Sequence, residues 1–184
     1  MTMKLRIALP LLVATTTLLS ACVSQSTYKQ EVAKADTYQQ LNSRLQSEVA
    51  ADQAQITQLQ NVVRVSLANG ILFPEGGWEL NAGGKATVAK LAPVLKTLSG
   101  QTIQLKGYTD NLPIGPELRS RFPSNVELSK ARAQAVASEL AAQGVAGPMI
   151  SVAGFGDADP VASNDTPQGR AKNRRVVMDI VEAK

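Results

Sequence analysis

The apolar residues of this chain change their spacing near residue 62, and this change most constrains the fold. Residues 26–61 contain no proline and no glycine and consist largely of residues that form helices well or acceptably. From residue 62 onward, short segments with a period of two are interleaved with longer segments of helical period. We therefore predict one long polar helix followed by an α+β domain.

Within the predicted domain, strand and helix signals alternate. Asn81 can cap a helix that Gly100 stops, and Pro93 is expected to bend this helix or end it early. Thr166 before Pro167 marks the start of a short helix. The order strand, helix, strand, helix, strand, short helix, strand predicts a two-layer α+β domain with its helices packed on one sheet. The expected strands are 62–74, 102–108, 150–155 and 175–181, and the expected helices are 82–99, 125–143 and 167–173.

Apolar residues in the predicted polar helix mostly recur three or four positions apart, as at Tyr38, Leu41 and Leu45, with Asp52 interrupting the stripe. A stripe this narrow favours a coiled-coil contact over docking on a large core. If fully helical, residues 26–61 would reach about 54 Å and hold the domain away from an N-terminal anchor. A partly disordered, Gln-rich tether is the alternative.

The first 21 residues have the pattern of a cleavable signal peptide. Lys4 and Arg6 precede an apolar run over residues 7–19, which is shorter than the about 20 residues that a membrane span needs. Small residues then lead directly to the only cysteine, Cys22. An ordinary secretory leader followed by a free thiol would also show this pattern.

The sequence Leu19-Ser20-Ala21-Cys22 resembles the lipobox of bacterial lipoproteins. The resemblance implies that Cys22 becomes the mature N-terminus and carries diacylglycerol and an amide-linked acyl chain such as palmitate. Val23 after the cysteine favours the outer membrane, with the domain in the periplasm. The implied boundaries are a signal peptide at 1–21, a lipidated N-terminus with a helical or coiled-coil tether at 22–61, and the domain at 62–184.

The composition excludes most catalytic chemistry. The chain has no histidine and one cysteine, so serine triads, Cys–His dyads and His-bearing zinc sites each lack a required side chain. Removal of the leader lowers the net charge from +4 to +2, a surplus too small to indicate nucleic-acid binding. No cofactor and no metal is expected.

The predicted strand end at Tyr108 and the helix that follows bring opposite charges together. Asp110 lies just beyond the strand, and Arg132 lies inside the helix that begins near Asn125. The two side chains could face a common ligand, because Asp accepts from an ammonium and Arg offers a planar fork to a carboxylate. A structural ion pair between strand and helix is the alternative.

Several motifs resemble the OmpA-like peptidoglycan-binding domain, in order and spacing, over residues 62–184. The loop after Asn111 is most similar to the MotB branch, although the stator role of that branch is not expected here, because the leader carries no acidic residue. Two departures are Tyr108 where the family usually has His, and Pro74 where many relatives have Asp. The matching motifs are Gly107-x-Thr109-Asp110-Asn111, Asn125-x-x-Leu128-Ser129-x-x-Arg132-Ala133, Gly154-x-Gly156, Pro160 and Asn164-x-Thr166-x-x-Gly169-Arg170-x-x-Asn173-Arg174-Arg175-Val176.

The resemblance implies that Asp110 and Arg132 hold the diaminopimelate of a peptidoglycan stem peptide, whose free end is a zwitterion. Of the adjacent Arg174 and Arg175, one is expected to point inward and support the fold. The other ligand-binding residues implied are Thr109, Asn111, Asn125 and Leu128 as wall and supporting groups, and Phe73 on the far side.

The function implied is a non-catalytic lipoprotein that tethers the outer membrane to peptidoglycan. The alternative is a signalling or assembly subunit of an envelope complex that regulates the same wall binding, with residues 26–61 recruiting a protein partner or a second copy. An enzyme acting on the wall is disfavoured, because a glycosidase needs a pair of carboxylates and the motif offers one beside a cation.

Overall fold

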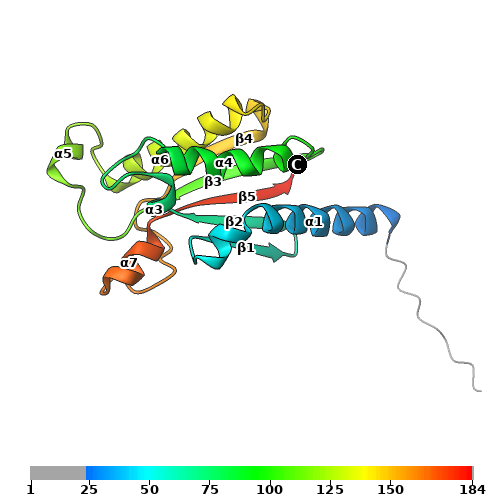
Figure 1. The fold of residues 1–184 in the computed structure, drawn as a ribbon, viewed down its shortest axis with the longest axis horizontal. Helices are drawn as coiled ribbons and strands as arrows, with labels where there is room; N and C mark the ends of the chain where they lie inside the picture. Colours follow the sequence, from blue (N-terminus) through cyan, green and yellow to red (C-terminus); the bar gives the residue numbers. More distant parts are fainter. Residues whose placement is uncertain (1–23, 184) are drawn as a thin grey trace, which may run out of the picture.

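The computed structural model describes residues 24–183, which form a five-stranded sheet with helices packed against it (Figure 1). The strand order is β1-β2-β5-β3-β4, and only β3 and β4 run parallel. The α+β fold class predicted from the sequence is confirmed. The strands are β1 (Ala54–Leu59), β2 (Val62–Ala68), β3 (Gln101–Tyr108), β4 (Ile150–Gly154) and β5 (Arg175–Glu182); the helices are α1 (Gln25–Arg44), α2 (Gln46–Ala50), α3 (Asn69–Leu72), α4 (Ala82–Leu95), α5 (Pro116–Arg119), α6 (Asn125–Ala142), the short 3-10 helix η1 (Gly147–Met149) and α7 (Pro167–Asn173).

Side-chain caps fix the helix starts that the sequence predicted. The Asn81 Oδ1 accepts from the Gly84 N–H at 2.7 Å before α4, and the Thr166 hydroxyl accepts from the Gly169 N–H at 3.0 Å before α7. Helix α4 continues through Pro93 and ends two residues later, short of Gly100.

The core lies between one face of the sheet and the helices, because the strands bury alternate residues. In β2 every second residue is buried and the residues between are half-exposed, because successive side chains of a strand point to opposite faces of the sheet. Figure 1 shows α4 and α6 side by side over this face of the sheet. Fully or nearly fully buried core residues include Val63, Val65 and Leu67 of β2, Ile103 and Leu105 of β3, Met178 and Ile180 of β5, Leu91 and Leu95 of α4, and Val136 and Leu140 of α6.

The predicted helix over residues 26–61 is wrong in its second half. Helix α1 ends at Arg44, Asp52 adopts a φ of 57°, and β1 then pairs with β2 from Ala54↔Leu67 to Leu59↔Val62. The edge of β2 offers the backbone of residues 54–59 hydrogen-bond partners, and this tertiary pairing outweighs the local helix propensity. The boundary predicted at residue 62 therefore falls at the turn of a hairpin.

The expected coiled-coil stripe is also wrong for the second half of α1, which packs on its own domain. Leu41 and Leu45 are fully buried in the main core. The Lys34 ammonium donates to the Gln60 carbonyl at the β1–β2 turn, and the Glu48–Lys90 ion pair, at 2.6 Å, joins α2 to α4. A tether reaching about 54 Å is therefore excluded for this arrangement.

The segment predicted as a strand over residues 70–74 forms the single helical turn α3 instead, which returns the chain from β2 toward α4. Within residues 24–183, no helix is both long and apolar enough to span a membrane. The predicted signal peptide and Cys22 lie outside the described residues.

Candidate ligand-binding site

Close backbone contacts fix the end of β3 against the start of α6. At Gly107 a Cβ would overlap the Ser129 carbonyl, so glycine permits the helix to approach this closely. The fully buried Ser129 hydroxyl accepts from the Gly156 N–H at 3.0 Å. The Thr109 N–H donates to the Gly156 carbonyl at 2.6 Å. These contacts set the position of Asp110 relative to Arg132.

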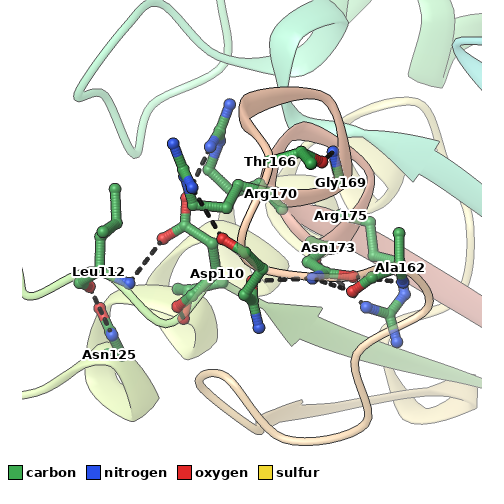
Figure 2. A network of polar contacts seen from close by, with 12 residues as sticks. Asp110, Leu112, Asn125, Ala162, Thr166, Gly169, Arg170, Asn173 and Arg175 are labelled. Carbon is green, nitrogen blue, oxygen red and sulfur yellow. Dashed lines mark hydrogen bonds and ion pairs between the residues drawn. The ribbon is translucent and has the colours of Figure 1, made fainter.

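Asp110 is 6% exposed and is held from two sides. Its Oδ2 accepts from Arg174 Nη1 at 2.6 Å, and its Oδ1 accepts from the Leu112 N–H at 3.2 Å. The Thr109 hydroxyl donates to the Asp110 carbonyl at 2.8 Å. Figure 2 shows Asp110 between Leu112 and Asn125 on one side and Asn173 and Arg175 on the other.

Arg132 is 7% exposed. Among residues 24–183, only the Nε of its guanidinium donates a hydrogen bond to a protein group. Its Nε donates to the Gly77 carbonyl at 2.9 Å, and its guanidinium lies 5.7 Å from the centre of the Phe73 ring. Burial lowers the pKa of Arg132 to about 10, with the charge of Arg174 adding to this effect and that of Asp110 opposing it. Arg132 therefore remains a cation at neutral pH.

Asp110 and Arg132 do not form an ion pair with each other. Arg174, which lies between α7 and β5, is the partner of Asp110, and its charge also acts on Arg132. One carboxylate and two guanidiniums thus share this region, which leaves a surplus positive charge for an anionic group. The sequence reasoning missed Arg174 as a site residue. Adjacent residues of an extended chain face opposite sides. Because Arg175 is the buried member of the pair, Arg174 could have been assigned to the side that carries Asp110.

The remaining predicted residues occupy different places. Phe73 is buried beside Arg132, whereas Asn111 is exposed. The Asn125 side chain donates to the Leu112 carbonyl at 3.0 Å and so ties α6 to the loop that follows Asp110. Leu128 packs in a small apolar cluster under the same loop, with Ile114 and Phe122.

Two loops, 74–80 and 111–124, meet next to Arg132. The Trp78 and Phe122 rings pack edge to face with their centroids 5.4 Å apart, and Arg121 lies 4.6 Å from the centre of the Trp78 ring. Trp78 follows Gly77, whose carbonyl holds Arg132. The only tryptophan of the chain is thus a built-in reporter of this site, which sequence reasoning did not identify.

This arrangement has the charges that recognition of a small zwitterion requires, because fixed cations and one fixed carboxylate lie at the same strand and helix ends. A planar guanidinium donates two parallel hydrogen bonds to a carboxylate, each contributing about 1.5–3 kcal/mol. Among residues 24–183 there is no cluster of His, Cys, Asp or Glu that could hold a metal ion.

Comparison with protein families gives one match, a model described as the OmpA family, over residues 72–174. This segment contains Phe73, Asp110, Arg132 and Arg174.

Similar curated proteins share the same region. The peptidoglycan-binding protein ArfA of Mycobacterium tuberculosis is 39% identical over 118 residues, which are 64% of this chain and 34% of ArfA. The probable lipoprotein YiaD of Escherichia coli is 33% identical over 134 residues, 73% of this chain and 58% of YiaD. The outer-membrane lipoprotein YfiB of Pseudomonas aeruginosa is 34% identical over 112 residues, 61% of this chain and 62% of YfiB. The chain thus spans less than two thirds of the length of each of these relatives.

Two solved structures resemble the fold. A MotB-like protein of Desulfovibrio vulgaris has a TM-score of 0.75 at 24% identity, covering 86% of this chain and 99% of that one. The cell wall anchor of the type VI secretion system of Pseudomonas aeruginosa has a TM-score of 0.68 at 32% identity, covering 78% and 97%.

Proposed function

This chain belongs to the OmpA family of peptidoglycan-binding domains, and from that premise we propose that it is a non-catalytic lipoprotein that tethers the outer membrane to peptidoglycan. Its ligand would be the diaminopimelate of the stem peptides, bound at Asp110 and Arg132. The binding would be non-covalent and reversible.

The observation that carries this proposal is the state of Arg132. Its guanidinium is buried, is fixed by the Gly77 carbonyl through Nε alone, and faces no carboxylate that pairs with it among the described residues. A buried cation that lacks a counter-ion is costly unless a ligand supplies one. A ligand carboxylate at the remaining donors of Arg132 would meet this need.

Asp110 would supply the other half of the zwitterion site. Its carboxylate is anchored by Arg174 and by the Leu112 N–H, so it is held in place before a ligand arrives. An ammonium group could donate hydrogen bonds to the remaining lone pairs of the Asp110 carboxylate. Arg174, whose side chain is 40% exposed, would then contact the same ligand from the solvent side.

The membrane end of the tether rests on the sequence and on the relatives. The lipobox-like Leu19-Ser20-Ala21-Cys22 ends shortly before Gln25, where α1 begins, and two similar proteins are named as lipoproteins. Because the second half of α1 is docked on the domain, the tether would be short, with only the first turns of α1 and the residues before it between lipid and domain.

The test is co-sedimentation of the protein with purified sacculi. Asp110→Ala and Arg132→Ala should each strongly reduce pelleting, and free diaminopimelate should compete with the unchanged protein. Arg44→Ala, at the end of α1, serves as a matched control that removes a guanidinium elsewhere. Pelleting of both site variants at the level of the unchanged protein would refute the proposed site.

The lipid is tested separately by labelling cells with a radioactive fatty acid. The protein should incorporate the label and fractionate with the outer membrane, and Cys22→Ser should lose both properties. A labelled Cys22→Ser variant would contradict lipidation at this residue.

A second candidate function is a signalling or assembly subunit of an envelope complex. The observation that favours it is the exposed start of α1, where Tyr28 is 65% and Val32 is 50% exposed on one side of the helix. A protein partner could bind this surface. Substituting both residues by Ser should then leave sacculus binding intact but release the partner in a crosslinking experiment, and unchanged crosslinking would exclude this surface.

A further inference from the structure

The face of the sheet opposite the core carries a cavity of about 640 Å³ that is separate from the site at Asp110. Its floor is formed by side chains of β1, β2, β3 and β5, and the segment 155–161 forms one wall. A volume of this size is typical of sites for small ligands. The residues that matter for its chemistry are Thr57, Arg64, Lys106, Tyr108, Asp159 and Arg175.

Arg175 is the most unusual group in this cavity. It is 6% exposed, and its guanidinium lies 3.8 Å from the centre of the Tyr108 ring. Its hydrogen-bond partners are neutral: Nη2 donates to the Asp159 carbonyl at 2.9 Å and Nη1 to the Asn173 carbonyl at 3.2 Å. No carboxylate forms an ion pair with it among residues 24–183. A buried cation that pairs only with carbonyls leaves an uncompensated charge.

The other charges around the cavity do not cancel this surplus. Arg64 binds Asp179 through two hydrogen bonds of 2.6 and 2.8 Å, and Lys106 binds the same carboxylate at 2.8 Å. Asp179 is therefore shared between two cations. The remaining acidic group is Asp159, whose residue is exposed at the rim. Three cations thus face two carboxylates, and the cavity has an excess of one positive charge.

We propose that this cavity is a second binding site, which takes a carboxylate of another peptidoglycan stem peptide. This inference rests on the proposed function for the identity of the ligand. Arg174 and Arg175 are neighbours in the chain and serve opposite sides of the sheet, so the two sites lie back to back at the start of β5. Two contacts on one rigid body would make binding to the polymer stronger than binding to a single soluble muropeptide.

The test is an NMR titration of the protein with a soluble disaccharide-tripeptide muropeptide that ends in diaminopimelate. Occupancy of the first site is followed at the Trp78 indole N–H and the Leu112 amide. Occupancy of the cavity is followed at the amides of Ser66 and Val177, which line it. Both sets of signals should shift in the unchanged protein.

The variant that isolates the second site is Thr57→Glu. Thr57 lines the cavity and lies opposite Arg64 in the β1–β2 register, so the new carboxylate would neutralise the surplus charge from within. It should weaken the response of the cavity signals about tenfold while the Trp78 response is unchanged. Thr102→Glu, on β3 outside the cavity, is the matched control and should leave both responses intact. Asp110→Ala should remove the first response and keep the second.

The outcomes separate the two proposals. If the Trp78 signal saturates while the cavity signals stay fixed, or if Thr57→Glu titrates like the unchanged protein, the second site is refuted and the first stands. If the Trp78 and Leu112 signals stay fixed while the cavity signals shift, the proposed function at Asp110 is refuted and the cavity site stands. If no signal shifts, both are refuted.

Discussion

Two buried arginines, Arg132 and Arg175, lie on opposite sides of the same sheet. Both have the same types of contact, but Arg175 has more hydrogen bonds and a closer aromatic ring. Both are at most 7% exposed, both lie over an aromatic ring, and both donate to backbone carbonyls. Burial lowers the pKa of each guanidinium. Arg132 has one carbonyl partner and a ring at 5.7 Å, whereas Arg175 has two carbonyl partners and a ring at 3.8 Å.

The difference shows how the same residue type can stabilise the fold at one position and bind a ligand at another. The more donors of a guanidinium the protein satisfies, the more its loss costs the fold and the fewer donors remain for a ligand. Arg175 should therefore contribute mainly to stability and act on a ligand in the cavity through its charge, whereas Arg132 should contribute mainly to ligand binding through its free donors.

Arg175→Ala should lose more stability than any other variant considered for these two arginines. Removing this side chain deletes two hydrogen bonds and a close cation–π contact, and leaves the carbonyls of Asp159 and Asn173 without their partner. We expect the free energy of unfolding in urea to fall by about 3–4 kcal/mol. A loss below about 1 kcal/mol would show that Arg175 is not a structural support.

The next effect is on the binding of Arg132→Ala. Its affinity for muropeptide should fall about 100-fold, because two charge-assisted hydrogen bonds to the ligand are lost. Its free energy of unfolding should change by less than about 1.5 kcal/mol, since only the bond to the Gly77 carbonyl is lost. Arg132→Lys should restore the charge but not the affinity, because an ammonium lacks the planar fork. Equal stability losses in the Arg132 and Arg175 variants would remove the distinction.

Asp179 is the carboxylate that pairs with Arg64 and Lys106 on the side of the sheet that carries Arg175. Burial would raise its pKa, but hydrogen bonds from Arg64 and Lys106 leave the pKa of Asp179 below its ordinary value. Such a group contributes stability above its unfolded pKa of about 3.9, and this stability is lost as the pH falls through the lower folded pKa. Acid titration of the unchanged protein should therefore show declining stability from about pH 5 downward.

Asp179→Asn should flatten this acid decline and lower stability at pH 7 by about 2 kcal/mol. It should also strengthen carboxylate binding in the cavity, because Arg64 and Lys106 would then lack their shared counter-ion. Urea unfolding at several pH values and the NMR titration measure the two effects. A variant with the acid response of the unchanged protein would assign that response to other carboxyl groups.

The smallest effect concerns the rings. Replacing Phe73 or Tyr108 by Leu keeps an apolar side chain but removes the cation–π contact, which contributes about 0.5–2 kcal/mol and weakens with distance. Tyr108→Leu should therefore cost more stability than Phe73→Leu, because its ring is closer to its guanidinium. Unfolding curves of the two variants measure this difference. The reverse order would mean that ring packing, not the cation, dominates at these positions.

Local sequence signals were sufficient where the chain encodes structure over a few residues. The caps Asn81 and Thr166 and the alternating apolar residues of β2 predicted elements that the structure contains, and most predicted bounds lie within one or two residues of the observed ones. The motif around Asp110 and Arg132 likewise predicted two side chains near one strand end. The sequence could not show that Arg174, far along the chain, is the partner of Asp110.

The chain's own residues determined the α+β order, the helix starts and the two ends of the candidate site, because capping, periodicity and glycine turns act between near neighbours. Contacts between distant segments place residues 54–59 in an edge strand, bury Leu41 and Leu45 in the core, and direct Arg174 and Arg175 to different sides of the sheet. These outcomes depend on pairing between segments distant in the chain, where the free energy of burial and strand pairing exceeds the small differences in local propensity.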